Sequence, residues 1–159
     1  MIRSSLCYIE NNDCYLMLYR NKKKDDPNAG KWIGVGGKFE SGESGLQCVS
    51  REVLEETGLE GLEFNYRGLV HFRSDLWEDE EMYLYTASLE DRPLELDACS
   101  EGTFEWIPKK EVLGLRLWEG DRYFLESLLE SASLAEASTP FEMTLWYEGD
   151  NLVEVVRGE

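Results

Sequence analysis

The sequence has no long apolar run, only 4 prolines and a single histidine in 159 residues, and 16 basic residues against 33 acidic ones. A transmembrane helix needs about 18 or more consecutive apolar residues, and no stretch approaches that length. The chain also does not open with the basic and then apolar segments of a secretory signal. We therefore expect neither a membrane-spanning nor an exported protein, and the cytoplasm is the expected location.

The 4 cysteines form no C-x-x-C pair, and the single histidine leaves too few ligands for a structural zinc site. We interpret Cys7, Cys14, Cys48 and Cys99 as small buried thiols in a reducing compartment. His71 falls in a stretch where polar and apolar residues alternate. It is predicted to be a wall or core residue rather than a catalytic base.

The shortage of lysine and arginine gives the chain a net charge of −17 and a pI of about 4.4. Binding to nucleic acids and to anionic membrane surfaces depends on clustered basic residues, so neither kind of partner is expected. An excess of acidic residues is most often a solubility feature. Only a local cluster of acids would indicate a functional site.

The rest of the composition is that of a globular protein. Apolar residues make up 42% and aromatic residues 12% of the chain, which excludes disordered, low-complexity and collagen-like classes. A chain of this length can bury one core, and no internal repeat or linker divides it. We predict a single domain over residues 1–159, acting as a monomer or a homodimer.

Two β-prone runs that flank a segment with turn chemistry predict a hairpin near the start of the chain. Its strands are Ser4 to Glu10 and Cys14 to Arg20, and the intervening Asn11-Asn12-Asp13 has the residue types of a tight turn. The charged segment from Asn21 to Lys31 is predicted to be a mobile surface loop. A short extended segment, Trp32 to Val35, should follow it.

The apolar period becomes helical after Ser44. Leu46, Val49 and Val53 are spaced as one apolar stripe. Ser44 begins a capping-box pattern, and Gly58 is a typical residue just beyond a helix end. The sequence therefore predicts a helix between Ser44 and Gly58 whose stripe packs on the core.

The second half of the chain is predicted to contain more strands and one more helix. The expected strands are Phe64 to Arg73, Met82 to Leu89, Thr103 to Ile107, Phe141 to Tyr147 and Leu152 to Val156; the expected helix is Asp121 to Leu129; the connections include an acidic loop from Asp75 to Glu81 and a small-residue segment from Ser131 to Pro140. The fold class that follows is α+β, a mixed β-sheet with helices packed on its faces.

Three carboxylates share one face of the first predicted helix. A step of 100° per residue places Glu52, Glu55 and Glu56 on an arc about 100° wide. Like charges at this spacing repel one another, so a cation is expected between them. Carboxylate oxygens suit a hard divalent ion, Mg²⁺ or Mn²⁺. The alternative is a solvated acidic face without metal.

The residues around this helix follow a longer pattern. The segment from Gly37 to Leu59, GKFESGESGLQCVSREVLEETGL, resembles the signature of the Nudix hydrolases, G-x5-E-x7-R-E-U-x-E-E-x-G-U with U aliphatic, at every specified position. The resemblance implies the Nudix fold, a mixed β-sheet sandwiched between α-helices, and a loop, helix and loop that bind divalent cations. It also implies hydrolysis of a nucleoside diphosphate linked to another group.

The same resemblance implies roles for individual residues. Arg51 and Glu43 are expected to form an internal pair that fixes the loop on the helix, and Arg51 is therefore counted with the catalytic residues. Glu52 or Glu101 is the expected base. The expected metal ligands are Glu52, Glu55, Glu56, Glu101 and the Gly36 carbonyl. For Glu101 the alternative is an exposed loop acid.

Three further segments, WIGVGGKFE, CSEGTFEWIP and LWEGDRYFLESLL, are similar to the MutT-type group of the family, which removes oxidised purine triphosphates. Trp118 and Asp121 fall where such proteins stack on a purine and hydrogen-bond it. The sequence departs from the group at two positions. Gly120 stands in place of an acid, and Ile33 stands in place of an amide side chain that reads the base.

A polyphosphate still carries negative charge after one or two ions bind. The expected phosphate-binding groups are Gly37, which lets the backbone approach closely, and the side chains of Lys38 and Arg20. Lys31 and the run Lys22 to Lys24 could help to draw substrate in. The alternative for these lysines is a solvated loop.

The predicted function is hydrolysis of a nucleoside triphosphate, most specifically an oxidised purine such as 8-oxo-dGTP, to the monophosphate and pyrophosphate. One alternative keeps this chemistry with ADP-ribose or another nucleoside diphosphate derivative as substrate. The other is a module that binds a nucleotide without cleaving it. Trp118 and Asp121 disfavour the first alternative, and the complete set of helix carboxylates disfavours the second. In every case the expected partner is a small-molecule nucleotide.

Overall fold

A computed structural model of the chain describes residues 1–93, 95–96, 99–131 and 139–158. The elements are β1 (Ile2–Asn11), β2 (Cys14–Tyr19), β3 (Trp32–Ile33), β4 (Val35–Lys38), α1 (Gly45–Thr57), β5 (Phe64–Ser74), β6 (Glu80–Ser88), β7 (Thr103–Pro108), α2 (Lys109–Val112), α3 (Asp121–Ser131), β8 (Phe141–Glu148) and β9 (Asn151–Arg157). None of the helices in these ranges is long and apolar enough to cross a membrane.

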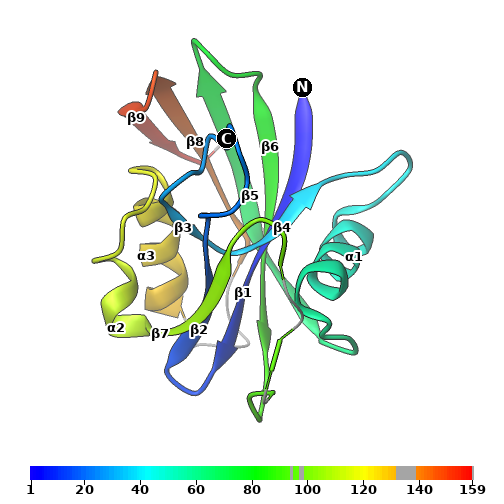
Figure 1. The fold of residues 1–159 in the computed structure, drawn as a ribbon. Helices are drawn as coiled ribbons and strands as arrows, with labels where there is room; N and C mark the ends of the chain where they lie inside the picture. The colour runs from blue at the N-terminus through cyan, green and yellow to red at the C-terminus, as the bar shows by residue number, and fades with distance from the viewer. Residues whose placement is uncertain (94, 97–98, 132–138, 159) are drawn as a thin grey trace.

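The strands form one mixed sheet between helices. Its order is β3-β2-β1-β6-β5-β8-β9, with β4 paired to β1 and β7 paired to β2. The β1–β6 and β5–β8 pairs are parallel, and the β1–β2 and β5–β6 pairs are antiparallel. Helices α1 and α3 lie on opposite sides of the strands (Figure 1). The predicted α+β class, with a mixed sheet sandwiched between helices, is confirmed.

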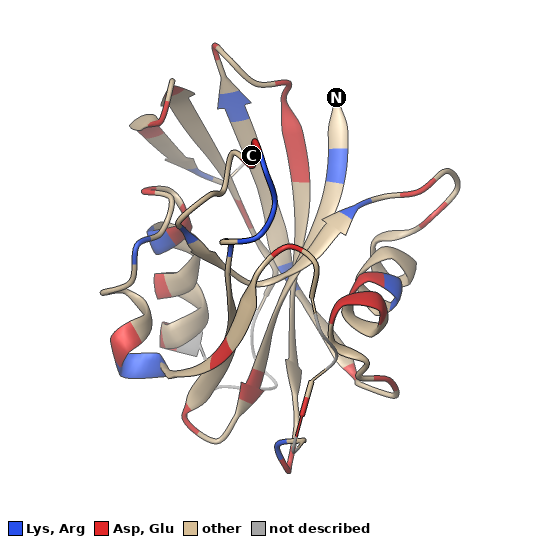
Figure 2. Ribbon diagram, in the orientation of Figure 1, with Lys and Arg blue, Asp and Glu red and all other residues tan. Residues whose placement is uncertain are grey.

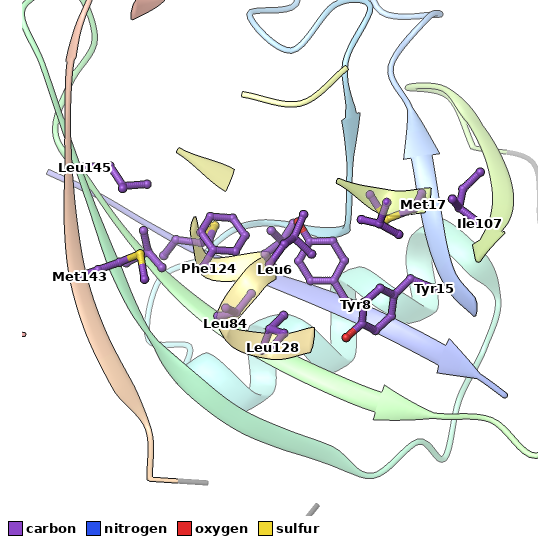
Figure 3. Packing of buried hydrophobic residues seen from close by; sticks show 14 of the residues in the cluster. Leu6, Tyr8, Tyr15, Met17, Leu84, Ile107, Phe124, Leu128, Met143 and Leu145 are labelled. Carbon is purple, nitrogen blue, oxygen red and sulfur yellow. The ribbon is translucent and has the colours of Figure 1, made fainter. Parts of the chain in front are cut away.

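The central strand β1 is buried on both faces because each face is covered by a helix. Leu6 and Tyr8 belong to the core cluster on the α3 side, whereas Cys7 and Ile9 belong to the cluster on the α1 side. Figure 3 shows Phe124 of α3 packed near Leu6 and Tyr8. The predicted hairpin at the start of the chain is confirmed, and Asn12 in its turn has a positive φ of 53°.

Helix α1 begins and ends where the sequence predicts. Ser44 forms the capping box, and Gly58 adopts the left-handed conformation with φ 78°. Val49 and Val53 are buried as expected, but Leu46 is 53% exposed, so its place in the core stripe was wrong. In the first turn the sheet side is occupied by Gly45, against the rings of Tyr83 and Tyr85, and this close approach leaves Leu46 at the rim.

Several element bounds differ from the predictions. Strand β6 starts two residues earlier than expected, because Glu80 and Glu81 pair with β1 and β5, and the acidic loop is shorter by the same amount. The short helix α2 was not predicted. The expected extended segment after the charged loop is two strands, β3 and β4, separated by Gly34. Most of the expected connection from Ser131 to Pro140 lies outside the described residues.

At Gly36, the backbone of β4 lies so close to the backbone of β1 that no side chain fits between them. A β-carbon added there would lie 1.9 Å from the carbonyl oxygen of Ser5, which is backbone and cannot move away cheaply. We predict that Gly36→Ala lowers the free energy of unfolding by at least about 2 kcal/mol, a drop of several degrees in Tm. Gly114→Ala, whose added carbon meets its nearest atom at 3.4 Å, is the control. Equal thermal midpoints for the two variants would contradict this packing.

Candidate active site

A cavity of about 760 Å³ opens between α1, the segment after β2, the β5–β6 loop and the start of α3. It brings together residues that are far apart in the sequence. The predicted site residues that line it are Arg20, Ile33, Gly36, Gly37, Lys38, Arg51, Glu52, Glu55, Glu101, Trp118 and Asp121. One end of the cavity is rich in carboxylates, and the other end is aromatic.

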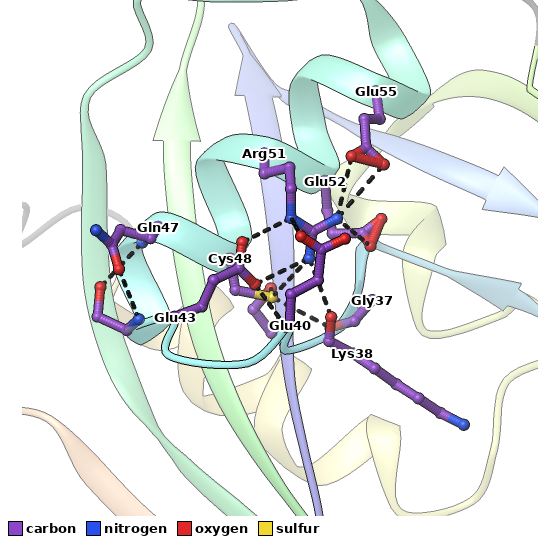
Figure 4. A network of polar contacts seen from close by, with 11 residues as sticks. Gly37, Lys38, Glu40, Glu43, Gln47, Cys48, Arg51, Glu52 and Glu55 are labelled. Carbon is purple, nitrogen blue, oxygen red and sulfur yellow. Dashed lines mark hydrogen bonds and ion pairs between the residues drawn. The ribbon is translucent and has the colours of Figure 1, made fainter.

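The expected pair between Arg51 and Glu43 is present. Arg51 donates from Nε to Glu43 Oε2 at 2.6 Å and from Nη2 to Glu43 Oε1 at 2.9 Å, as Figure 4 shows. A third hydrogen bond joins Arg51 Nη2 to the Lys38 carbonyl at 3.1 Å. The guanidinium lowers the pKa of Glu43 to about 2. This bidentate pair holds the loop before α1 on the helix.

Arg51 also reaches the helix carboxylates. Its Nη1 lies 3.3 Å from Glu52 Oε2 and 3.1 Å from Glu55 Oε2. Glu52 in turn lies directly on the backbone of β4, because a β-carbon at Gly37 would stand 2.2 Å from its Oε2. Only glycine permits that approach, so Gly37 is needed for the position of Glu52. Lys38 extends away from these carboxylates in Figure 4.

Glu56 is the buried acid of this cluster that accepts no hydrogen bond from the described residues. Both of its oxygens are buried, and no N–H or O–H group of the described residues hydrogen-bonds to either of them. Burial, followed by the neighbouring carboxylates of Glu52 and Glu101, raises the pKa of Glu56 to about 9. A solvated acidic face would show none of this. The alternative of a merely exposed helix face therefore does not describe Glu56.

This carboxylate cluster fits a divalent cation. Buried oxygens without donors, close to further carboxylates, are the donor set that hard ions prefer. In the described ranges, no three acidic, histidine or cysteine side chains are already arranged as a ligand set. An ion bound there would compete with Arg51 for the carboxylates of Glu52 and Glu55.

Glu101 reaches the same end of the cavity from the segment before β7, held by Arg20. Arg20 Nη1 lies 3.3 Å from Glu101 Oε1, and Arg20 Nε donates to Asp26 Oδ2 at 2.8 Å. Arg20 and Asp26 are both 8% exposed. The charged loop from Asn21 to Lys31 is therefore anchored by a buried ion pair in its middle, rather than lying wholly on the surface as predicted. Figure 2 shows the blue basic run of this loop near the middle of the view and the red acidic residues of α1 to its right.

Trp118 at the other end of the cavity is held on three sides. Its indole N–H donates to Asn28 Oδ1 at 2.7 Å, and Lys31 Nζ lies 4.3 Å from the centre of the ring. Tyr147 meets it edge-on, with ring centres 5.5 Å apart and an angle of 89°. Lys31 thus contacts Trp118 instead of extending freely into solvent.

Asp121 is a buried acid beside this tryptophan. It is 5% exposed, and burial, with a smaller contribution from the Glu80 carboxylate, raises its pKa to about 8 against the opposing charge of Lys31. At neutral pH the carboxyl group is therefore mostly protonated, and it can both donate and accept a hydrogen bond. The sequence predicted the residue but not its protonation state.

Close packing explains why a glycine stands at position 120. A β-carbon there would lie 2.6 Å from Leu145 Cδ1 and 2.7 Å from the Tyr147 hydroxyl, and the Gly120 N–H donates to that hydroxyl at 2.7 Å. The C-terminal hairpin thus occupies the space in which a side chain at 120 would lie. Ile33 lines the cavity with an apolar surface.

Sequence reasoning missed several residues that line the cavity. They are Asn28, Phe72, Trp77, Glu80 and Tyr147. Glu80 and Tyr147 lie on strands, where alternation tells which residues share a face but not what that face meets. Asn28 and Trp77 lie on connections, which carry no periodic signal. No pattern in the sequence marks these residues as part of a site.

The chain is similar to known proteins in sequence and in fold. The model of the NUDIX domain matches residues 2–128. The chain is 27% identical over 135 residues to the uncharacterized Nudix hydrolase YvcI of Bacillus subtilis, covering 83% of this chain and 82% of that protein. It is 31% identical over 111 residues to the oxidized purine nucleoside triphosphate hydrolase of Danio rerio, covering 68% and 69%.

Solved structures agree with the sequence relatives. A mutator MutT protein from Bacillus halodurans superimposes with a TM-score of 0.82 at 26% identity, covering 99% of this chain and 97% of that one. A MutT protein from Methanosarcina mazei Go1 superimposes with a TM-score of 0.67 at 27% identity, covering 82% and 94%. The likeness to the first includes nearly the whole length of both chains.

The raised pKa of Asp121 predicts a pH effect on stability. Between its ordinary value of 3.8 and about 8, the folded protein holds one more proton than the unfolded chain, so the free energy of unfolding falls as pH rises through this window. Asp121→Asn removes this dependence. The difference in thermal midpoint, variant minus wild type, should grow from pH 4 to about 8 and then stay constant. Melting curves without metal measure it, and parallel pH profiles would contradict the buried acid.

Proposed function

The chain belongs to the Nudix family, and from this premise we propose that it hydrolyses nucleoside triphosphates carrying an oxidised purine, such as 8-oxo-dGTP, to the monophosphate and pyrophosphate. Membership makes the protein a hydrolase of nucleoside phosphoanhydrides. The observation that carries the finer proposal is the single cavity that joins the buried carboxylate cluster to the pocket of Trp118 and Asp121. The substrate named for the Danio rerio relative agrees with it.

Nudix hydrolases generally use divalent metal ions, and we infer Mg²⁺, with Mn²⁺ as a substitute. The groups that would hold the ions are Glu52, Glu55, Glu56, Glu101 and the Gly36 carbonyl. When bound, the ions supply positive charge that stabilises the phosphate oxygens and the departing phosphate group. The pairing of Arg51 with Glu43 supports this assignment, because it keeps α1 and the preceding loop in register.

The remaining chemistry falls to the side chains. Glu52 or Glu101 accepts the proton of the attacking water. Arg20 holds Glu101 in the cavity. The five N–H donors of its guanidinium leave capacity for a phosphate oxygen beyond the two ion pairs. Gly37 and Lys38 complete the proposed phosphate contacts.

The aromatic end is proposed to hold the base. The purine stacks on the indole of Trp118, which Asn28 and Tyr147 keep in place. The protonated Asp121 carboxyl reads the edge of the base, since it offers one donor and one acceptor. Ile33 contributes an apolar wall.

Turnover of a substrate panel with Mg²⁺ tests the proposed function. The panel contains 8-oxo-dGTP, the ordinary dNTPs, ADP-ribose and a diadenosine polyphosphate. We expect 8-oxo-dGTP to have the highest kcat/KM, with the monophosphate and pyrophosphate as products. Higher kcat/KM for ADP-ribose or the dinucleotide would refute the triphosphate assignment while leaving the family chemistry intact.

Trp118→Ala tests the base clamp on the same panel. Because base stacking contributes to binding of substrate and transition state alike, we expect KM for purine triphosphates to rise roughly 10-fold with a smaller change in kcat. The matched control is Trp146→Ala, which removes a tryptophan that is 43% exposed on β8. An unchanged KM for every base in Trp118→Ala would count against stacking at this position.

Glu56→Gln tests the metal cluster. The amide keeps the shape of the side chain and removes its charge, so we expect kcat to fall at least about 100-fold while the fold is retained. The control is Glu60→Gln, the same change at an exposed position just after α1. Calorimetry with Mn²⁺ should show weaker binding in Glu56→Gln only. A folded Glu56→Gln variant with full activity would remove Glu56 from the ligand set.

A further inference from the structure

On the floor of the cavity, Glu80 of β6 lies among apolar side chains of the sheet. Strand register places Ile2 of β1, Glu80 of β6 and Phe72 of β5 side by side, and all three line the cavity. Two residues further along β6, Met82 lines the same floor. Glu80 therefore stands between two apolar side chains, on the face of the sheet that meets the substrate.

A carboxylate at this position loses hydration, which costs free energy unless hydrogen-bond donors or a cation replace the lost water. Ser4 Oγ donates to Glu80 Oε2 at 2.5 Å, which engages one of the two carboxylate oxygens. Among the residues that the structure describes, no lysine or arginine forms an ion pair with Glu80. An ionised carboxylate over apolar neighbours without a cation loses hydration that one hydroxyl only partly replaces.

The adjacent residue provides the contrast. Glu81 points to the opposite face of the sheet, since successive side chains of a strand alternate. There its Oε1 lies 3.4 Å from Arg3 Nε, and its Oε2 lies 3.7 Å from His71 Nδ1. Glu81 has the partners of a structural acid. Glu80 has none of these and faces the cavity.

Asp121 faces the same cavity as Glu80. The Glu80 carboxylate disfavours ionisation of Asp121 and so helps to raise its pKa. At neutral pH the Asp121 carboxyl is mostly protonated, so it supplies an O–H donor in addition to the acceptor oxygens of Glu80. The pair then offers one O–H donor and several acceptor oxygens, which is more than either residue offers alone.

We propose that Glu80 is a specificity-determining residue that reads the base together with Asp121, and that the two select a guanine-type edge. This inference rests on the proposed function. A guanine presents one carbonyl acceptor beside a ring N–H and an exocyclic amino group, so it supplies one acceptor and two neighbouring donors. The protonated Asp121 donates to the carbonyl and accepts from the ring N–H, and Glu80 accepts from the amino group. An adenine-type edge lacks the second adjacent donor and leaves Glu80 desolvated and unpaired.

The test compares dGTP with dITP, which differ only in the exocyclic amino group, and includes dATP. For the wild type we expect kcat/KM to follow the order dGTP, dITP, dATP. Glu80→Gln should reduce the dGTP to dITP ratio of kcat/KM by about 10-fold or more, mainly through KM, because a hydrogen bond to a charged acceptor is lost. The matched control, Glu81→Gln, should keep the ratio. Ser4→Ala, which removes the hydroxyl that holds Glu80, should reduce it by a smaller factor.

Binding of the monophosphates dGMP, dIMP and dAMP, measured by calorimetry without metal, separates this inference from the proposed function. A protein that binds dGMP in preference to dIMP in a Glu80-dependent way, yet cleaves no triphosphate, would refute the proposed function and support the role of Glu80. Equal dGMP to dIMP ratios in the wild type and a folded Glu80→Gln variant would overturn the inference, whatever the turnover. Thermal midpoints establish that each variant is folded.

Discussion

Repulsion among buried carboxylates is the constraint on which this site depends. Glu52 and Glu101 line one end of the cavity, and the buried Glu56, whose pKa they help to raise, accepts no hydrogen bond within the described part of the chain. Two arginines counter the repulsion from the sides: Arg51 from within the helix and Arg20 from the strand opposite. A divalent ion bound between these carboxylates, as proposed above, would relieve this repulsion.

Close backbone approach makes that cluster possible. Glu52 rests against Gly37, and Gly36 lies against the carbonyl of Ser5, so β4 runs closer to both β1 and α1 than side chains would allow. The first turn of α1 approaches the sheet in the same way through Gly45. As a result, the carboxylates of α1 lie close to the strands of the sheet. Water is scarce there, so interactions between charges are stronger.

At the aromatic end of the cavity, charge is offset in a different way. Its acid, Asp121, is neutralised by burial instead of by a cation, and its tryptophan is oriented by neighbours from three separate segments, at Asn28, Lys31 and Tyr147. One cavity therefore offers a charged end suited to metal and phosphate and a nearly neutral, aromatic end suited to a base. A nucleotide has the same two-part chemistry, as the proposed function requires.

The sequence by itself determined the hairpin turn at Asn12, the capping box and C-cap of α1 and the carboxylate arc, because these depend on local spacing and local chemistry. The pairing of Arg51 with Glu43 followed from the resemblance to the Nudix signature. The sequence misplaced Leu46 and treated the segment containing Asp26 as surface, since local pattern does not tell which neighbour covers a residue. Only the tertiary structure decided that burial raises the pKa of Asp121. It also decided that the C-terminal hairpin fills the space beside Gly120, and that Glu80 faces the cavity while Glu81 does not. Each of these depends on burial and on contacts between strands and loops distant in sequence, and such contacts exist only once the sheet has formed.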